Sequence, residues 1–171
     1  HIERSALGLR LDPPDEKDAP WMLRDTTGKD RAVTLVFTVP YEGPGLRWLA
    51  DPRRSELVEP GREYSATHHF RVGSAQRLSR YPFAAVSGEG RGQWLGIDLE
   101  FPAVYRCGYN SSSGELFVAF DIGLAPEKRS ARIAVKGSCF PGNTFRDALG
   151  VYYRFFGKHF PTRTETPEQG L

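Results

Sequence analysis

The sequence contains only two cysteines, Cys107 and Cys139, and no C-x-x-C pair. Two cysteines are too few for the disulfide framework that stabilises small secreted domains. Both fall in strand-like segments, so the sequence fits either one disulfide between neighbouring strands or two buried free thiols.

Charge of one sign and long apolar runs are also lacking. With 23 Lys and Arg against 21 Asp and Glu, the formal net charge is +2, which is too small to argue for a nucleic-acid partner. No apolar run approaches the roughly 20 residues that a membrane-spanning helix needs, so no membrane partner is expected. The 171 residues, 39% of them apolar and 26% charged, are typical of one globular domain with a sizeable core.

Recognisable catalytic motifs are missing as well. The sequence has no G-x-S-x-G elbow, no P-loop, no H-E-x-x-H pair and no Rossmann fingerprint. The glycine-rich segment 88–92 joins two strand patterns, so it is expected to be a hairpin loop and not a phosphate cradle. His68 and His69 are adjacent and would point to opposite faces of a strand. We therefore expect no metal site and no cofactor.

The sequence does contain many short strand patterns separated by Gly, Pro, Asn and Ser. The clearest is 31–39, where apolar and β-branched residues alternate. Their spacing of roughly ten to fifteen residues is typical of an antiparallel β-sandwich. Residues 48–61 are expected to form a polar connection, and 110–114 a hairpin loop. The predicted strands cover residues 6–11, 21–23, 31–39, 62–72, 81–87, 93–99, 103–109, 115–122 and 131–140.

A single helix pattern follows the strands. Thr144 is a suitable N-cap, and Asp147 places a carboxylate in the first turn. The apolar stripe that follows has helical spacing and should pack on a sheet face or against a neighbouring domain. The predicted organisation is therefore an all-β sandwich over residues 1–143, one C-terminal helix over 144–160 and a linker over 161–171.

Three carboxylates are candidates for acid–base chemistry. Asp98 and Glu100 lie two residues apart in a strand pattern and would share one face, and Asp121 lies on an otherwise apolar strand. A pair of such acids is the requirement for glycoside hydrolysis. Acids on a solvated strand face, or at a turn, are equally an ordinary structural feature of sandwiches.

Aromatic and arginine side chains suggest a second function. Aromatic rings offer flat faces on which sugars stack, and nearby guanidinium groups can donate hydrogen bonds to hydroxyls. Core packing is the competing explanation, and it is favoured for most of the aromatics. The candidate binding residues are Arg80, Tyr81, Trp94, Arg106 and Tyr109.

Four segments in order resemble a known kind of protein: 79–87 (SRYPFAAVS), 105–109 (YRCGY), 119–124 (AFDIGL) and 145–156 (FRDALGVYYRFF). Together they resemble the N-terminal β-sandwich region of large, mostly bacterial glycoside hydrolases in which a (β/α)8 barrel follows. The resemblance covers about the last hundred residues. It implies a broad, many-stranded (supersandwich-like) fold whose helix leads into a catalytic barrel.

The resemblance also implies an accessory function. Catalytic acids of such enzymes lie on the barrel, so none is assigned to this chain, and the sandwich would help to shape the sugar site. The expected partner is an adjoining catalytic domain of the same polypeptide, with an oligosaccharide as a further ligand. The start at His1 without a signal-peptide pattern and the end at Leu171 suggest an excised domain of a longer protein. The expected location of that protein is outside the cell or in the periplasm. The helix residues expected at the domain interface are Phe145, Leu149, Tyr152, Tyr153 and Phe156.

Two alternatives remain open from the sequence. The chain would be a free-standing carbohydrate-binding module if its aromatics are exposed and coplanar. It would be a self-sufficient glycosidase if two of Asp98, Glu100 and Asp121 converge in a pocket.

Overall fold

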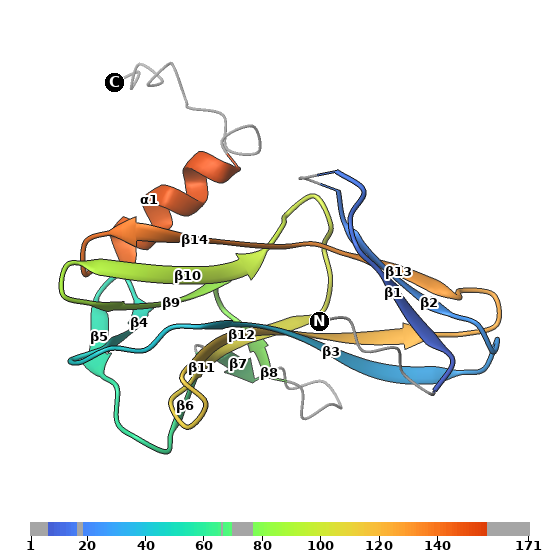
Figure 1. The fold of residues 1–171 in the computed structure, drawn as a ribbon, viewed down its shortest axis with the longest axis horizontal. Helices are drawn as coiled ribbons and strands as arrows, with labels where there is room; N and C mark the ends of the chain where they lie inside the picture. Colours follow the sequence, from blue (N-terminus) through green and yellow to red (C-terminus); the bar gives the residue numbers. More distant parts are fainter. Residues whose placement is uncertain (1–6, 17–18, 66, 70–76, 157–171) are drawn as a thin grey trace, which may run out of the picture.

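The computed structural model describes residues 7–16, 19–65, 67–69 and 77–156 (Figure 1). The fold is made mostly of antiparallel β-sheets, with one helix near the C-terminus. This confirms the all-β, sandwich-like fold expected from the strand patterns. Among the described residues, no helix has the length and apolar character needed to cross a bilayer.

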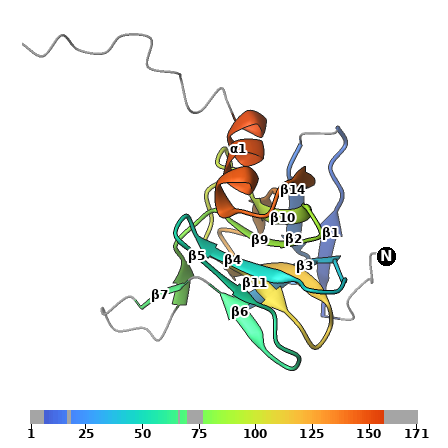
Figure 2. The same ribbon diagram turned by 90° about the vertical axis from the view of Figure 1, so that its left-hand side faces the viewer.

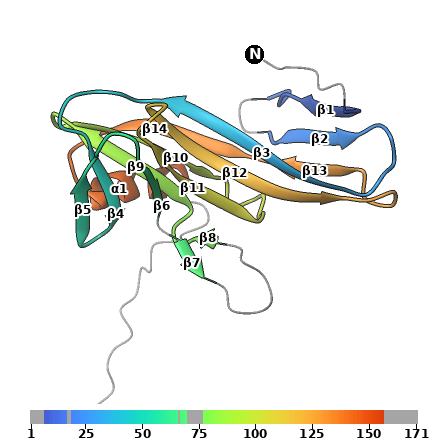
Figure 3. The ribbon, with the colours of Figure 1, turned by 90° about the horizontal axis from the view of Figure 1, so that it is seen from below.

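Two sheets form the body of the sandwich. The five-stranded sheet has the order β14-β10-β9-β4-β5, and the four-stranded sheet has the order β3-β12-β11-β6. Figure 3 shows β3 and β12 running side by side, and they pair over their whole length from Arg31 with Leu124 to Pro40 with Glu115. The strands of the first sheet are β14 (Val135–Pro141), β10 (Arg91–Ile97), β9 (Phe83–Gly88), β4 (Arg47–Asp51) and β5 (Arg54–Leu57), and those of the second are β3 (Arg31–Pro40), β12 (Glu115–Leu124), β11 (Tyr105–Asn110) and β6 (Glu63–Ser65).

Two smaller sheets complete the described part of the chain. One has the order β1-β2-β13, and the other is the pair β7-β8. Their strands are β1 (Leu9–Asp12), β2 (Trp21–Asp25), β13 (Ser130–Ile133), β7 (Thr67–His69) and β8 (Arg77–Ser79).

The inner core lies between the two main sheets. Alternate residues of β10 and β12 point into it, so both strands bury the apolar members of their patterns there. Its fully or almost fully buried members include Val86, Leu95, Leu116, Val118 and Phe120. Transfer of this apolar surface out of water is the main force that holds the two sheets together.

A second apolar cluster covers the opposite face of the five-stranded sheet. Helix α1 (Phe145–Phe155) lies on that face, so the molecule has three layers: helix, five-stranded sheet and four-stranded sheet (Figure 2). The sheet contributes Leu49, Phe83, Ala85, Trp94 and Phe140, and the helix region contributes Phe145, Ala148, Val151, Tyr152 and Phe156. β9 and β10 are therefore buried on both faces.

The N-terminus of α1 is closed by a capping box. The Asp147 amide donates to Thr144 Oγ1 at 3.2 Å, and the Thr144 amide donates back to Asp147 Oδ2 at 2.9 Å. The hydrogen bond from the Thr144 side chain lowers the pKa of Asp147, so the carboxylate stays charged at the positive end of the helix dipole. The predicted cap is confirmed. The helix ends at Phe155 and not at residue 160, and the predicted linker 161–171 lies outside the described residues.

The hairpin loops expected at 88–92 and 110–114 are both present. Between β9 and β10 the turn is only two residues long, and both residues have positive φ: 52° at Glu89 and 80° at Gly90. Two successive positive φ values are typical of a type I′ turn, whose twist matches that of the flanking strands.

Residues 48–57 do not form the polar connection that the sequence suggested. They form the hairpin β4-β5, and Trp48 and Ala50 face the inner core while Leu49 faces α1. A strand that is buried on both faces does not alternate between apolar and polar residues. The usual strand signal is therefore absent.

Two other predicted strands are divided in the structure. Residues 131–140 split at Ala134, where the chain leaves the three-stranded sheet as β13 and enters the five-stranded sheet as β14. Residues 62–72 contribute β6 and β7, which belong to different sheets, and residues 66 and 70–72 of that prediction lie outside the described part.

Candidate functional site

Asp98 does not share a strand face with Glu100, contrary to the expectation from spacing. β10 ends at Ile97, and Asp98 Oδ1 accepts a hydrogen bond from the Glu100 amide at 3.0 Å within the following turn. Asp98 is 4% exposed, and burial together with the nearby charges of Tyr105 and Asp98 raises the pKa of Tyr152 on α1. Ile97 packs in the inner core, so the next residue, Asp98, lies toward the helix side of the five-stranded sheet, where it stabilises a turn.

Asp121 lies on the opposite side of the molecule. Because its neighbour Phe120 points into the inner core, Asp121 points out of the four-stranded sheet. There it accepts a hydrogen bond from Thr34 Oγ1 at 2.7 Å and pairs with the Arg106 guanidinium at 3.4 Å. The inner core separates it from Asp98, so these two acids do not converge as the glycosidase alternative requires.

Two of the candidate sugar-binding aromatics are core residues. Trp94 is fully buried beneath α1, and Tyr109 is 2% exposed in the inner core, where its hydroxyl donates to the Tyr41 carbonyl at 3.0 Å. Trp94 offers no face on which a sugar could stack and Tyr109 exposes very little of its ring, so the burial of both argues against stacking of a sugar on them. Their burial agrees with the competing explanation, core packing.

The other three candidates do not form one surface with them. Arg80 is exposed and Tyr81 is half-buried, with its ring 4.7 Å from that of Phe145. Arg106 projects from the outer face of the four-stranded sheet, where it pairs with Asp121. The five residues thus lie on β10, on β11 and in the segment just before β9, and they do not share one surface.

Most of the helix residues expected at a domain interface pack on the chain's own sheet. Phe145, Tyr152 and Phe156 are at most 4% exposed, and Leu149 is half-buried against the same cluster. These four residues are therefore largely covered by the chain's own sheet. Of the five expected interface residues, only Tyr153, at 43% exposure, is accessible to a neighbouring domain.

Phe155 was missed as a candidate and is 50% exposed. Its ring makes an edge contact with Trp94 at 5.5 Å, so one side of the ring is fixed and the other faces solvent. We call the two exposed rings, Tyr153 and Phe155, the α1 outer pair; they are two residues apart and therefore lie on opposite flanks of the helix. The helical pattern could have predicted their exposure, because Tyr153 and Phe155 are the sequence neighbours of the buried residues Tyr152 and Phe156.

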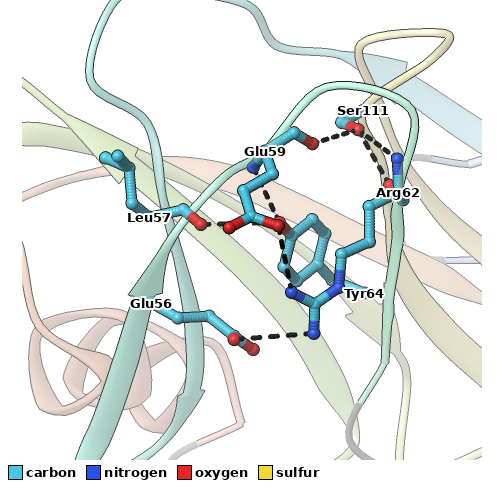
Figure 4. A network of polar contacts seen from close by, with 6 residues as sticks. All are labelled: Glu56, Leu57, Glu59, Arg62, Tyr64 and Ser111. Carbon is cyan, nitrogen blue, oxygen red and sulfur yellow. Dashed lines mark hydrogen bonds and ion pairs between the residues drawn. The ribbon is translucent and has the colours of Figure 1, made fainter.

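The loop end, where the loops following β3, β5 and β11 meet, contains a polar network that sequence reasoning did not find (Figure 4). Ser111 Oγ donates to the Glu59 carbonyl at 2.7 Å and accepts from the Arg62 amide at 2.8 Å. The Tyr64 hydroxyl accepts from the Glu59 amide at 2.7 Å, and the Arg62 guanidinium covers the Tyr64 ring at 4.7 Å. These contacts hold the 58–62 loop firmly against the 110–114 turn.

Two shallow cavities open at this loop end, on either side of Glu42. One has a volume of about 300 Å³ and the other about 320 Å³, and both are lined by Glu42, Gly43 and Leu46. The first continues along Leu57, Val58, Pro60, Tyr109 and Ser111, and the second along Tyr41, Pro44, Glu89 and Arg91. Neither cavity is lined by any of the three candidate acids.

The described part of the chain contains no candidate metal-binding cluster and no disulfide. No group of three or more His, Cys, Asp or Glu side chains there could hold a metal ion. Cys107 is buried on β11 and Cys139 is exposed on β14, and both are free thiols. Of the two expectations for the cysteines, the pair of unbridged thiols is the one found, although Cys139 is not buried.

A scan against protein-family models gives no match, and searches of curated proteins and of solved structures give none either.

Proposed function

We propose that the chain is a non-catalytic β-sandwich module of a carbohydrate-active enzyme of the glycoside hydrolase class. In this proposal the α1 outer pair contacts an adjoining catalytic domain of the same polypeptide, and the enzyme acts outside the cell or in the periplasm. The carbohydrate class comes from the resemblance of four segments, which correspond to β9, β11, β12 and α1. These elements form both cores of the module.

The observation that carries the docking part is the exposure of Tyr153 and Phe155 at 43% and 50%. The inner side of α1 is fully used against the five-stranded sheet, and two large aromatic rings remain exposed on the two flanks of the helix, Phe155 on the flank that also touches Trp94. Aromatic rings that are already immobilised on one side lose little entropy on binding and are common anchors of interfaces. Residues 157–171 follow the helix directly, so a domain attached there would have a high effective concentration at the α1 outer pair.

The distribution of acids supports a non-catalytic role. Hydrolysis of a glycosidic bond needs two carboxyl groups about 5–10 Å apart on either side of that bond. Asp98 stabilises a turn on the helix side, and Asp121 is paired with Arg106 on the far face of the other sheet. This geometry disfavours the self-sufficient glycosidase among the alternatives, and the burial of Trp94 and Tyr109 disfavours a module that binds sugars with those rings.

The docking proposal is tested on the polypeptide in which this chain is joined to the domain that follows it. We expect one coupled thermal transition for the unmodified protein in scanning calorimetry. Tyr153→Ser and the double variant Tyr153→Ser/Phe155→Ser should separate it into two transitions, because each removes apolar contact area at the interface. The single variant is needed since Phe155 also touches Trp94 within the module.

A matched control keeps the number of exposed apolar residues equal. Val36 and Leu57 are 51% and 57% exposed on β3 and β5, so Val36→Ser/Leu57→Ser should leave the transition coupled. The proposal fails if the helix variants behave like this control, or if no further domain follows the module.

A further inference from the structure

The two cavities at the loop end share their central residue, Glu42. Its side chain lies across the turn at Gly114, where its Cδ comes within 2.8 Å of the position a Cβ would occupy. Gly114 has a φ of 68° and no side chain, so the turn leaves space for the carboxylate. The Glu42 side chain is thus positioned by packing between the cavities.

The Glu42 carboxylate has no hydrogen-bond or ion-pair partner among the described residues. It lies close enough to Tyr109 that its charge, after burial, contributes to the raised pKa of that hydroxyl. A carboxylate has about four lone-pair sites and accepts two hydrogen bonds readily. Glu42 lines both cavities, so its carboxylate is available to a ligand in either of them.

A complementary donor lies on the wall of the second cavity. The Arg91 guanidinium is exposed and has no hydrogen-bond or ion-pair partner among the described residues, Glu42 included. The half-buried Tyr41 ring lies on the same wall and is held there by a hydrogen bond from its hydroxyl to the Arg91 carbonyl at 3.3 Å. The second cavity is therefore lined by a hydrogen-bond acceptor, the Glu42 carboxylate, by the N–H donors of the Arg91 guanidinium and by the Tyr41 ring.

The first cavity has a firm and partly apolar wall. Leu57, Val58 and Pro60 line it, and the network around Ser111 fixes the loop that carries them (Figure 4). Each cavity volume is at the lower limit of the range of about 300–1,000 Å³ found for small-molecule sites. Apolar contact with a few fixed polar groups is the usual composition of such sites.

We propose that the groove formed by these two cavities binds a short neutral oligosaccharide. Vicinal hydroxyls of one sugar donate to Glu42 and accept from Arg91, and the apolar C–H face of that ring lies on Tyr41. The next sugar lies along Leu57, Val58 and Pro60. The site contributes one charge of each sign from Glu42 and Arg91 and has the exposed Glu89 at its rim, so an anionic ligand is disfavoured and a neutral sugar can use both charged groups as hydrogen-bond partners. The site is separate from the α1 outer pair, so it does not depend on the docking proposal.

The test is a titration of the full chain with five neutral probes: cellohexaose, xylohexaose, maltohexaose, laminarihexaose and mannohexaose. At least one should bind with a dissociation constant of about 0.1–1 mM, measured by calorimetry. The backbone amide NMR shifts should concentrate at residues 41–46 and 89–91. Glu42→Gln and Arg91→Gln should each weaken binding about tenfold or more, because each removes a charge-assisted hydrogen bond.

Two control variants change the same residue types elsewhere. Glu63 on β6 and Arg132 on β13 are exposed and line neither cavity, so Glu63→Gln and Arg132→Gln should bind as the unmodified chain does. Tyr153→Ser should also leave binding unchanged, which distinguishes failure of this site from failure of docking. The proposal is overturned if no probe binds at about 10 mM, or if Glu42→Gln binds as well as Glu63→Gln.

Discussion

Trp94→Ala is expected to lower the free energy of unfolding by about 3–5 kcal/mol, the usual cost of truncating a fully buried large aromatic side chain. Trp94 is 0% exposed and lies between β10 and α1, with ring contacts to Tyr152 at 5.4 Å and to Phe83 at 6.2 Å. Its removal would leave a cavity that the rigid sheet cannot close, and the helix would lose its central contact. For a chain of this length the melting temperature should fall on the order of 10 °C.

The measurement is urea unfolding followed by circular dichroism, with Tyr153→Ala as control. Tyr153 is 43% exposed on the outer side of the same helix, so its truncation should cost about 1 kcal/mol or less. A loss below about 1 kcal/mol for Trp94→Ala would contradict the three-layer packing. It would return Trp94 to the set of surface candidates for sugar binding.

Gly96→Ala is the second substitution for which we expect a large effect. A Cβ at position 96 would lie 2.6 Å from the Cβ and 2.8 Å from the Cα of Phe83, and it would also collide with the Pro82 carbonyl oxygen. That carbonyl accepts a hydrogen bond from the Ile97 amide at 2.8 Å, so moving it would disturb the pairing of β9 with β10. We expect a loss of about 2–3 kcal/mol or more, at the upper end of overpacking costs.

Gly123 provides a matched control on another strand. Nothing lies within 4 Å of a Cβ built there, and its φ is not positive. Gly123→Ala should therefore change the stability by less than about 1 kcal/mol, in either direction. Equal effects of the two substitutions in thermal or urea unfolding would refute the close approach of β9 and β10.

The sequence predicted best those elements in which only one side is buried. β3 alternates because one face packs in the inner core and the other does not, and Thr144 correctly predicted the start of α1. Prediction from the sequence failed where a strand is buried on both faces, as at β4, and where the chain passes from one sheet to another, as at Ala134. Neither feature has a periodicity that a local pattern can show.

The candidate sites were harder to predict, and for a similar reason. Asp98 and Asp121 look equivalent in sequence, but the end of β10 and the direction of β12 place them on opposite sides of the inner core. Glu42, which follows β3, and Arg91, the first residue of β10, line one cavity only because β3 and β10 belong to sheets that pack face to face. Glu42 and Arg91 are far apart in the sequence, and their proximity cannot be predicted without knowing the order of the strands in the sheets.

The central claim, that the α1 outer pair contacts an adjoining domain, is tested most directly by hydroxyl-radical footprinting of Tyr153 and Phe155. The chain alone is compared with the polypeptide that also contains the following domain, and Val36 and Leu57 serve as internal references. We predict that oxidation of both rings falls several-fold in the longer polypeptide while oxidation of the two references is unchanged. Equal oxidation of Tyr153 and Phe155 in the two proteins would contradict the claim.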